Sequence, residues 1–235
     1  MTPLERRRHA FVVLLTLGTG VLDAVGFLHL GGAFSSVMTG NMVLLGISAA
    51  SAAMGQVLVV GGSIVAYIVG VVCGAHLAGT AQRTDGVWHR RVTLALAVEA
   101  VLLVALAICW LTVGAGGTPV MHHLMLGLSA LALGIQSSAI QRFGVAGLSS
   151  TYLTGTLTSV VAGFTAGRPA SRQIPGVLLL CALIVGAGFG YAVSTFVAPL
   201  APVLFLSPIA VVIVAASLTS WKEESPSPDG GALNR

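Results

Sequence analysis

Two short motifs that combine threonine with glycine recur along the chain. The first is Met38-Thr39-Gly40-Asn41, and the second, 115 residues further on, is Leu153-Thr154-Gly155-Thr156. Each follows a stretch of small residues and precedes an apolar, helix-like run. Each threonine is suited to cap a helix that begins at the following glycine, whose free N–H groups would face a polar or anionic group. The pair predicts a site for a small polar or anionic solute, built from two helix N-termini.

Other neutral side chains close to the two motifs are candidates for hydrogen bonding to the same solute. The candidate binding residues are Ser36, Thr39, Gly40, Asn41, Gln136, Tyr152, Thr154, Gly155 and Thr156, together with the acidic Asp23. For each of the small residues, a structural role in helix packing is an alternative to solute binding. Threonine and glycine at close spacing also let helices pack tightly in a membrane.

Two carboxylic acids fall inside apolar stretches, where a charge is costly and by default marks a functional or paired site. Asp23 lies past the middle of the first stretch, and Glu99 lies roughly 12 Å beyond Arg91 along a helix. Both are candidates for proton coupling, and Glu99 can alternatively form an inter-helix hydrogen bond in its protonated form. The position that corresponds to Asp23 in the second half is predicted to be Ser138. The sequence contains no recognisable catalytic, phosphate-binding or metal-binding motif, so no catalytic residue, metal or cofactor is predicted.

The elements that must position these residues are membrane helices. The chain has 235 residues, of which 56% are hydrophobic and only 8% are charged, far below the charged fraction of a soluble domain. Six apolar stretches are long enough to cross a hydrocarbon core of about 30 Å as helices. They are residues 10–31, 56–80, 92–114, 119–141, 174–196 and 201–220. The sequence therefore predicts an all-α polytopic membrane protein.

The basic residues predict the orientation of these spans. With a cytoplasmic N-terminus and six crossings, all eleven Lys and Arg residues lie on the cytoplasmic side, as the positive-inside rule expects. Full crossing by the two Thr-Gly segments, 35–54 and 149–167, would move four of the arginines outside. We therefore expect re-entrant segments that enter extended, turn at the motif and leave as short helices. Two ordinary polar spans remain the alternative.

Three crossings in each half would place the second half upside down relative to the first, as two inverted repeats. The predicted parts are a basic cytoplasmic N-terminus (1–9), a first repeat (10–114), a second repeat (119–220) and a disordered cytoplasmic tail (221–235). Gly70-x-x-x-Gly74 and Gly186-x-x-x-Gly190 occupy matching positions in the two halves. We expect these glycines to serve close helix packing within the fold.

Several of these stretches resemble the YoaK-like family of bacterial integral membrane proteins, a domain of unknown function. They are Leu22-Asp23-Ala24-Val25-Gly26-Phe27, Met38-Thr39-Gly40-Asn41, Gly134-Ile135-Gln136 and Thr151-Tyr152-Leu153-Thr154-Gly155-Thr156-Leu157-Thr158. The resemblance runs from about residue 10 to 220 and implies a protein of the bacterial inner membrane. It supplies no substrate and no mechanism.

These observations favour a transporter or channel with N- and C-termini in the cytoplasm. Its expected partners are the lipid bilayer and an unknown small solute, with no nucleic acid, and a homo-oligomer stays open. The alternative is a non-transporting membrane protein with a structural, assembly or regulatory role. An intramembrane enzyme ranks last, because no nucleophile or metal set aligns with Asp23 or Glu99.

Overall fold

Helices make up nearly all of the computed structural model, which describes residues 3–79, 90–113, 117–142 and 153–224. The described α-helices are α1 (Pro3–His29), α2 (Met38–Ala50), α3 (Met54–Ala78), α4 (Arg90–Val113), α5 (Pro119–Gln141), α6 (Leu153–Thr165), α7 (Ala170–Phe196) and α8 (Ala201–Glu224). A short 3-10 helix, η2 (Ala198–Leu200), connects the last two. No strand occurs in these ranges. The prediction of an all-α fold is confirmed.

Six of the helices are long and apolar enough to cross a membrane, and they coincide with the six predicted spans. The other two, α2 and α6, contain 13 residues each. At 1.5 Å per residue each is about 20 Å long, too short for a hydrocarbon core of about 30 Å. Helix α8 continues to Glu224, past the predicted end of the last span at residue 220. Residues 225–235 of the predicted tail lie outside the described residues.

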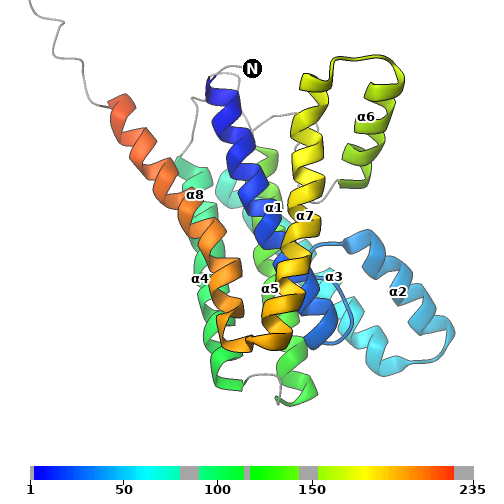
Figure 1. Cartoon of the computed structure of the whole chain (residues 1–235). Helices are drawn as coiled ribbons and strands as arrows, with labels where there is room; N and C mark the ends of the chain where they lie inside the picture. Colours follow the sequence, from blue (N-terminus) through cyan, green and yellow to red (C-terminus); the bar gives the residue numbers. More distant parts are fainter. Residues whose placement is uncertain (1–2, 80–89, 114–116, 143–152, 225–235) are drawn as a thin grey trace, which may run out of the picture.

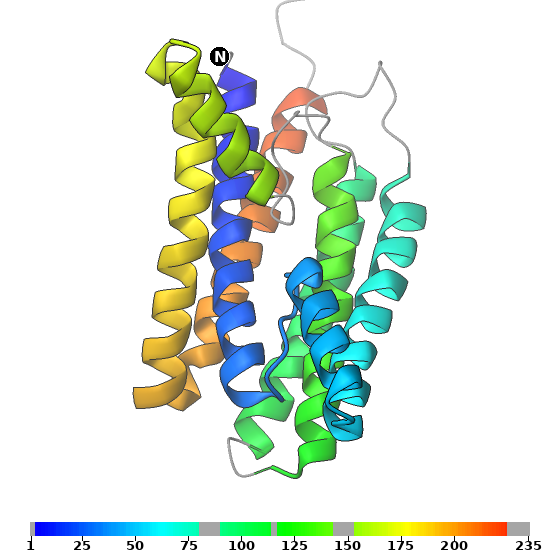
Figure 2. The same cartoon turned by 90° about the vertical axis from the view of Figure 1, so that its right-hand side faces the viewer.

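The first helices of the two halves, α1 and α5, occupy the middle of the bundle. More of their residues are buried than in any other candidate span. Helix α1 packs most extensively against α7, and α5 packs most extensively against α3. Each central helix thus pairs with a long helix of the other half, as Figures 1 and 2 show.

Glycines set the spacing of these two helix pairs. A Cβ added to Gly70 of α3 would overlap the Leu131 carbonyl oxygen of α5, and a Cβ added to Gly186 of α7 would overlap the Leu17 carbonyl oxygen of α1. Gly74 approaches Ile135 in the same way, and Gly190 approaches Val21. The predicted role of the two Gly-x-x-x-Gly motifs in packing within the fold is confirmed.

The glycine contacts also give the register between the two halves. Leu17 and Leu131, the partners of the corresponding glycines, are 114 residues apart, as are Val21 and Ile135. On this register Asp23 corresponds to Ser137, so the prediction of Ser138 is wrong by one residue. The reason is that the spacing of the Thr-Gly motifs, 115 residues, does not apply to the helices before them.

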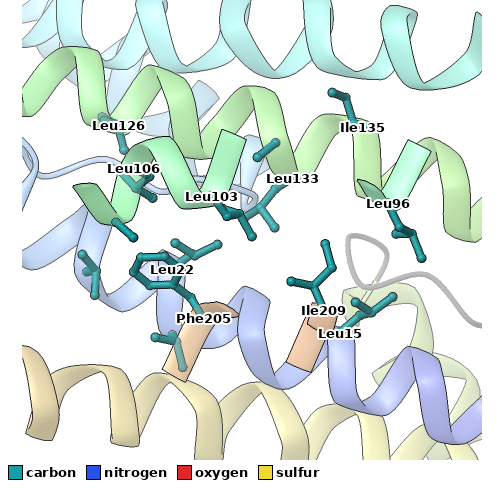
Figure 3. Close-up of a cluster of buried hydrophobic side chains, with 14 of the residues drawn as sticks. Leu15, Leu22, Leu96, Leu103, Leu106, Leu126, Leu133, Ile135, Phe205 and Ile209 are labelled. Atoms are coloured by element: carbon teal, nitrogen blue, oxygen red, sulfur yellow. The ribbon is translucent and has the colours of Figure 1, made fainter. Parts of the chain in front are cut away.

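An apolar cluster fills the space between α1, α4, α5 and α8 (Figure 3). Leu22 of α1, Leu103 of α4 and Phe205 of α8 are at most 2% exposed. The outward faces of the long helices are also apolar, and Ile184 of α7 and Val101 of α4 are 70% and 68% exposed. Apolar side chains on both the inside and the outside are what a lipid-embedded bundle requires.

The two short helices lie on one side of the bundle and run in opposite directions. In Figure 2, α2 starts about halfway along the bundle and runs toward the end that contains His29, whereas α6 runs toward the end that contains the N-terminus. Each short helix packs on the long helix that follows it, α2 on α3 and α6 on α7. The two short helices agree with the expected short Thr-Gly helices. The inverted repeat stays a prediction.

Candidate functional site

The chain between α1 and α2 is extended, and Asp23 holds it against α1. The Ser36 N–H donates to Asp23 Oδ1 over 2.7 Å, and the Ser36 hydroxyl donates to Asp23 Oδ2 over 2.6 Å. Both residues are buried, with exposures of 5% and 4%. Each carboxylate oxygen therefore has a hydrogen-bond donor from the extended segment, an arrangement that suits an ionised carboxylate.

Asn41, in the first turn of α2, satisfies the backbone of Phe34 in the same segment. The Phe34 N–H donates to Asn41 Oδ1 over 2.9 Å, and Asn41 Nδ2 donates to the Phe34 carbonyl oxygen over 2.7 Å. The Ser63 hydroxyl of α3 donates to the same carbonyl oxygen over 2.9 Å. Non-helical backbone at membrane depth needs such partners, so Asn41 has a clear structural role in the Thr-Gly-Asn motif.

A serine pair ties the segment to α5 as well. The hydroxyl oxygens of Ser35 and Ser129 lie 2.7 Å apart, and both residues are fully buried. Gly26 of α1 permits the close approach, because a Cβ there would lie 2.9 Å from the Ser35 hydroxyl oxygen. The extended segment is therefore fastened to α1, α3 and α5 together.

The N-termini of α2 and α6 lie near each other on one side of the bundle in both views (Figures 1 and 2). Thr39, Thr154 and Gly155 are exposed at these ends, and a Cβ added to Gly155 would meet nothing within 4 Å. Thr156 is buried, and Gly40 is half-buried against Val37 and Phe34. Tyr152 lies outside the described residues.

The predicted capping role of the two threonines is wrong. Helix α2 begins at Met38, one residue before Thr39, and its N-cap residue Val37 makes no side-chain cap hydrogen bond. Helix α6 likewise includes Leu153 and Thr154. A cap residue must lie outside the helical turn whose N–H groups it accepts, so threonines within the first turn cannot serve. Their exposed side chains stand beside the helix ends instead.

A second polar group crosses the core from α4 to α1, separate from the extended segment. Gln136 Nε2 of α5 donates to Glu99 Oε1 of α4 over 2.7 Å, and the Thr19 hydroxyl of α1 lies 3.1 Å from Gln136 Oε1, to which it donates. All three residues are buried, and Glu99 is 0% exposed. The structure thus places Gln136 with Glu99 rather than with the Thr-Gly motifs.

Sequence reasoning missed several members of these networks. They are Thr19, Ser35, Ser63 and Ser129, each of them buried. The sequence feature that could have indicated these residues is a polar side chain within an apolar stretch. Thr19, for example, lies one helical turn before Asp23. Serine and threonine are too common in membrane helices for that signal to select them. No group of three or more His, Cys, Asp and Glu side chains that could hold a metal occurs in the part of the chain that the structure describes.

The chain is similar to a family of proteins and to one transmembrane protein of known sequence. Residues 11–217 match the family described as "Protein of unknown function (DUF1275)". The chain is 38% identical over 154 residues to the UPF0700 transmembrane protein YoaK of Bacillus subtilis (strain 168). That alignment covers 66% of this chain and 66% of the relative, slightly under two thirds of its length. No solved structure matches the chain.

Proposed function

This chain belongs to the DUF1275 family of membrane proteins, and we propose that it is a transporter or channel for a small polar or anionic solute. The observation that carries the proposal is the pair of short helices whose N-termini point toward each other on one side of the bundle. Each N-terminus presents backbone N–H groups and a positive dipole end, which favour an anionic or polar guest. In this proposal the exposed Thr39, Thr154 and Gly155 line the solute site, and Tyr152 and Thr156 complete it.

In this proposal the chain is an inner-membrane protein without enzymatic activity, resident cofactor or nucleic-acid partner. Its expected partners are the bilayer and the solute, and self-association stays open. Asp23, Ser36 and Asn41 hold the extended segment that ends at α2 and so position one wall of the site. Glycine at position 40 keeps the start of α2 close to Phe34.

Water access to the two helix ends tests the proposal without knowledge of the solute. The native cysteines, Cys73, Cys109 and Cys181, are first replaced by serine. Single cysteines at Thr39 and Thr154 are then exposed to a membrane-impermeant thiol reagent in sealed vesicles of both orientations. We expect both positions to react, because a thiolate forms in water and not in lipid.

Ile184→Cys and Val101→Cys are matched controls, because both side chains are exposed near the middle of a long helix and face lipid in a membrane. They are expected to stay unlabelled. An anionic reagent should react faster than a cationic one at Thr39 and Thr154, since the helix dipoles attract anions. If both positions are as unreactive as Ile184→Cys in a folded protein, the proposed solute site at the two helix N-termini is wrong.

A second candidate function is a non-transporting structural, assembly or regulatory role. The observation that favours it is that both oxygens of Asp23 and the amide of Asn41 hydrogen-bond within the protein. On that reading the polar residues only fasten the extended segment. Unlabelled Thr39→Cys and Thr154→Cys variants in a folded protein would favour this candidate.

A further inference from the structure

Glu99 is a fully buried carboxyl group with one oxygen that has no hydrogen-bond partner. Its Oε1 accepts from Gln136 Nε2 over 2.7 Å. Its Oε2 is buried and has no partner among the described residues. An ionised carboxylate at this place leaves a charge without a counter-ion in the core, and protonation removes that charge.

The basic groups on the surrounding helices lie away from Glu99. Arg91 is eight residues earlier on α4, about 12 Å along the axis, and Arg142 is six residues beyond Gln136, about 9 Å along the axis. The other ionisable residues of α1, α3, α4 and α5 are Glu5, Arg6, Arg7, Arg8, His9, Asp23 and His29 on α1, Tyr67, Cys73 and His76 on α3, Arg90 and Cys109 on α4, and His122 and His123 on α5. Helix α8 has no ionisable residue between Ala201 and Leu218. Gln136 is therefore the polar side chain that the structure places on Glu99.

The two halves of the molecule provide an internal comparison for this polar group. On the 114-residue register of the central helices, Gln136 corresponds to Leu22 and Thr19 corresponds to Leu133. Both leucines are buried in the apolar cluster of Figure 3. The architecture thus accommodates leucine at each equivalent place, so packing alone does not require the amide and the hydroxyl. Polar residues that packing does not require point to function.

Asp23, the other buried carboxyl group, differs from Glu99 in its surroundings. Both of its oxygens accept hydrogen bonds from Ser36, one from the backbone and one from the hydroxyl. Such donors stabilise a carboxylate in place, whereas Glu99 has one donor and one unpartnered oxygen. Of the two groups, Glu99 is the one arranged to gain and lose a proton.

We propose that Glu99 is an exchangeable proton-binding site in the core between α1, α4 and α5. The neutral acid holds the proton on Oε2 and accepts from Gln136 through Oε1. On release, the O–H bond breaks, the proton passes to water that enters from the cytoplasmic side, and the carboxylate keeps the Gln136 hydrogen bond. The site makes solute movement proton-coupled, and this coupling alone rests on the proposed transport function.

Infrared spectroscopy of the full-length protein in lipid vesicles tests proton binding directly. The protonated carboxyl group has its own C=O stretching band, and ¹³C-labelled glutamate shifts the band of glutamic acids only. The chain has four glutamates, of which Glu5, Glu223 and Glu224 lie outside the apolar stretches. Spectra are recorded from mildly acidic to mildly alkaline pH for the wild type, Glu99→Gln and Asp23→Asn.

We expect one isotope-sensitive carboxyl band that disappears as the pH rises in the wild type. The band should be absent at every pH in Glu99→Gln and retained in Asp23→Asn. The labelled wild type gives the same information without a substitution, so the test holds even if a variant fails to fold.

Three results would overturn the proposal. A Glu99 band that stays constant over the whole pH range means a permanent structural hydrogen bond. Complete absence of the band means a permanently ionised group. Loss of the band on addition of Na⁺ at constant pH, without the same effect of K⁺, means a sodium site instead. None of these depends on the thiol labelling at Thr39 and Thr154, so failure of the proton site and failure of the solute site are distinguishable.

Discussion

At the residue scale, the polar side chains of the candidate site divide by what they contact. Asp23 and Asn41 hydrogen-bond the extended segment, whereas Thr39 and Thr154 are exposed at the ends of short helices. The first pair positions backbone that would otherwise lack partners in a membrane. The second pair is free of that task, and solute binding is proposed there for this reason.

Replacement of Asn41 by alanine tests its positioning role. The change leaves the N–H of Phe34 without its acceptor and removes one of two donors to its carbonyl oxygen. A buried backbone group without a partner costs about 1–3 kcal/mol, so we expect a lower unfolding temperature. Thermal denaturation in detergent measures it.

Thr39→Val, two residues earlier on α2, is the matched control for Asn41→Ala. Thr39 is exposed, and valine has almost the same shape, so the unfolding temperature should stay within error of the wild type. Equal stability of Asn41→Ala and the wild type would show that the amide is not needed to hold the segment.

At the element scale, the main pairings of long helices depend on glycine. Helices α3 and α5 meet at Gly70 and Gly74, and α1 and α7 meet at Gly186 and Gly190. Without a Cβ the backbones come close enough for carbonyl oxygens to contact the facing helix. Close packing of this kind drives helix association where water does not.

Gly186→Ala and Gly188→Ala make a matched pair on α7. A Cβ at Gly186 overlaps the Leu17 carbonyl oxygen of α1, whereas a Cβ at Gly188 meets nothing within 4 Å. Overpacking costs about 1–3 kcal/mol, so Gly186→Ala should lower the unfolding temperature. Gly188→Ala should leave it unchanged or raise it, because alanine favours a helix by up to about 1 kcal/mol over glycine. Equal effects of the two substitutions would contradict the packing of α1 on α7.

At the scale of the whole molecule, the described arginines gather at one end of the bundle. Helices α1, α4 and α7 begin at this end and α5 finishes there, and each carries an arginine or is followed by one. The opposite end contains His29, the turn between α2 and α3, and η2. From the positive-inside rule we predict that the arginine-bearing end faces the cytoplasm.

The side of the membrane on which residues 81–91 lie tests this orientation. A topology reporter fused after Gly86 should give a cytoplasmic signal, because six crossings place this connection on the side of the N-terminus. A reporter placed after Gly117, before α5, should give the opposite signal. A periplasmic signal after Gly86 would mean that the first Thr-Gly segment crosses fully, and the inverted repeat would then be excluded.

The sequence by itself determined the class of protein and its helices. Long apolar runs with few charges have no stable alternative to membrane helices, so the six spans could be placed from hydrophobicity alone. The two short helices were expected from the Thr-Gly motifs and the distribution of arginines. The Gly-x-x-x-Gly motifs were predictable for a similar reason, since small residues at this spacing form a flat helix face.

Only the tertiary structure decided which polar groups meet. Gln136 and Glu99 are 37 residues apart in the sequence, and their contact depends on how α4 packs against α5. The prediction of threonine caps was wrong because α2 begins at Met38, two residues before the predicted start at Gly40, a matter of local backbone geometry. Hydrophobicity is a property of each segment and can be read along the chain, whereas hydrogen bonds between helices depend on register and rotation, which packing alone sets.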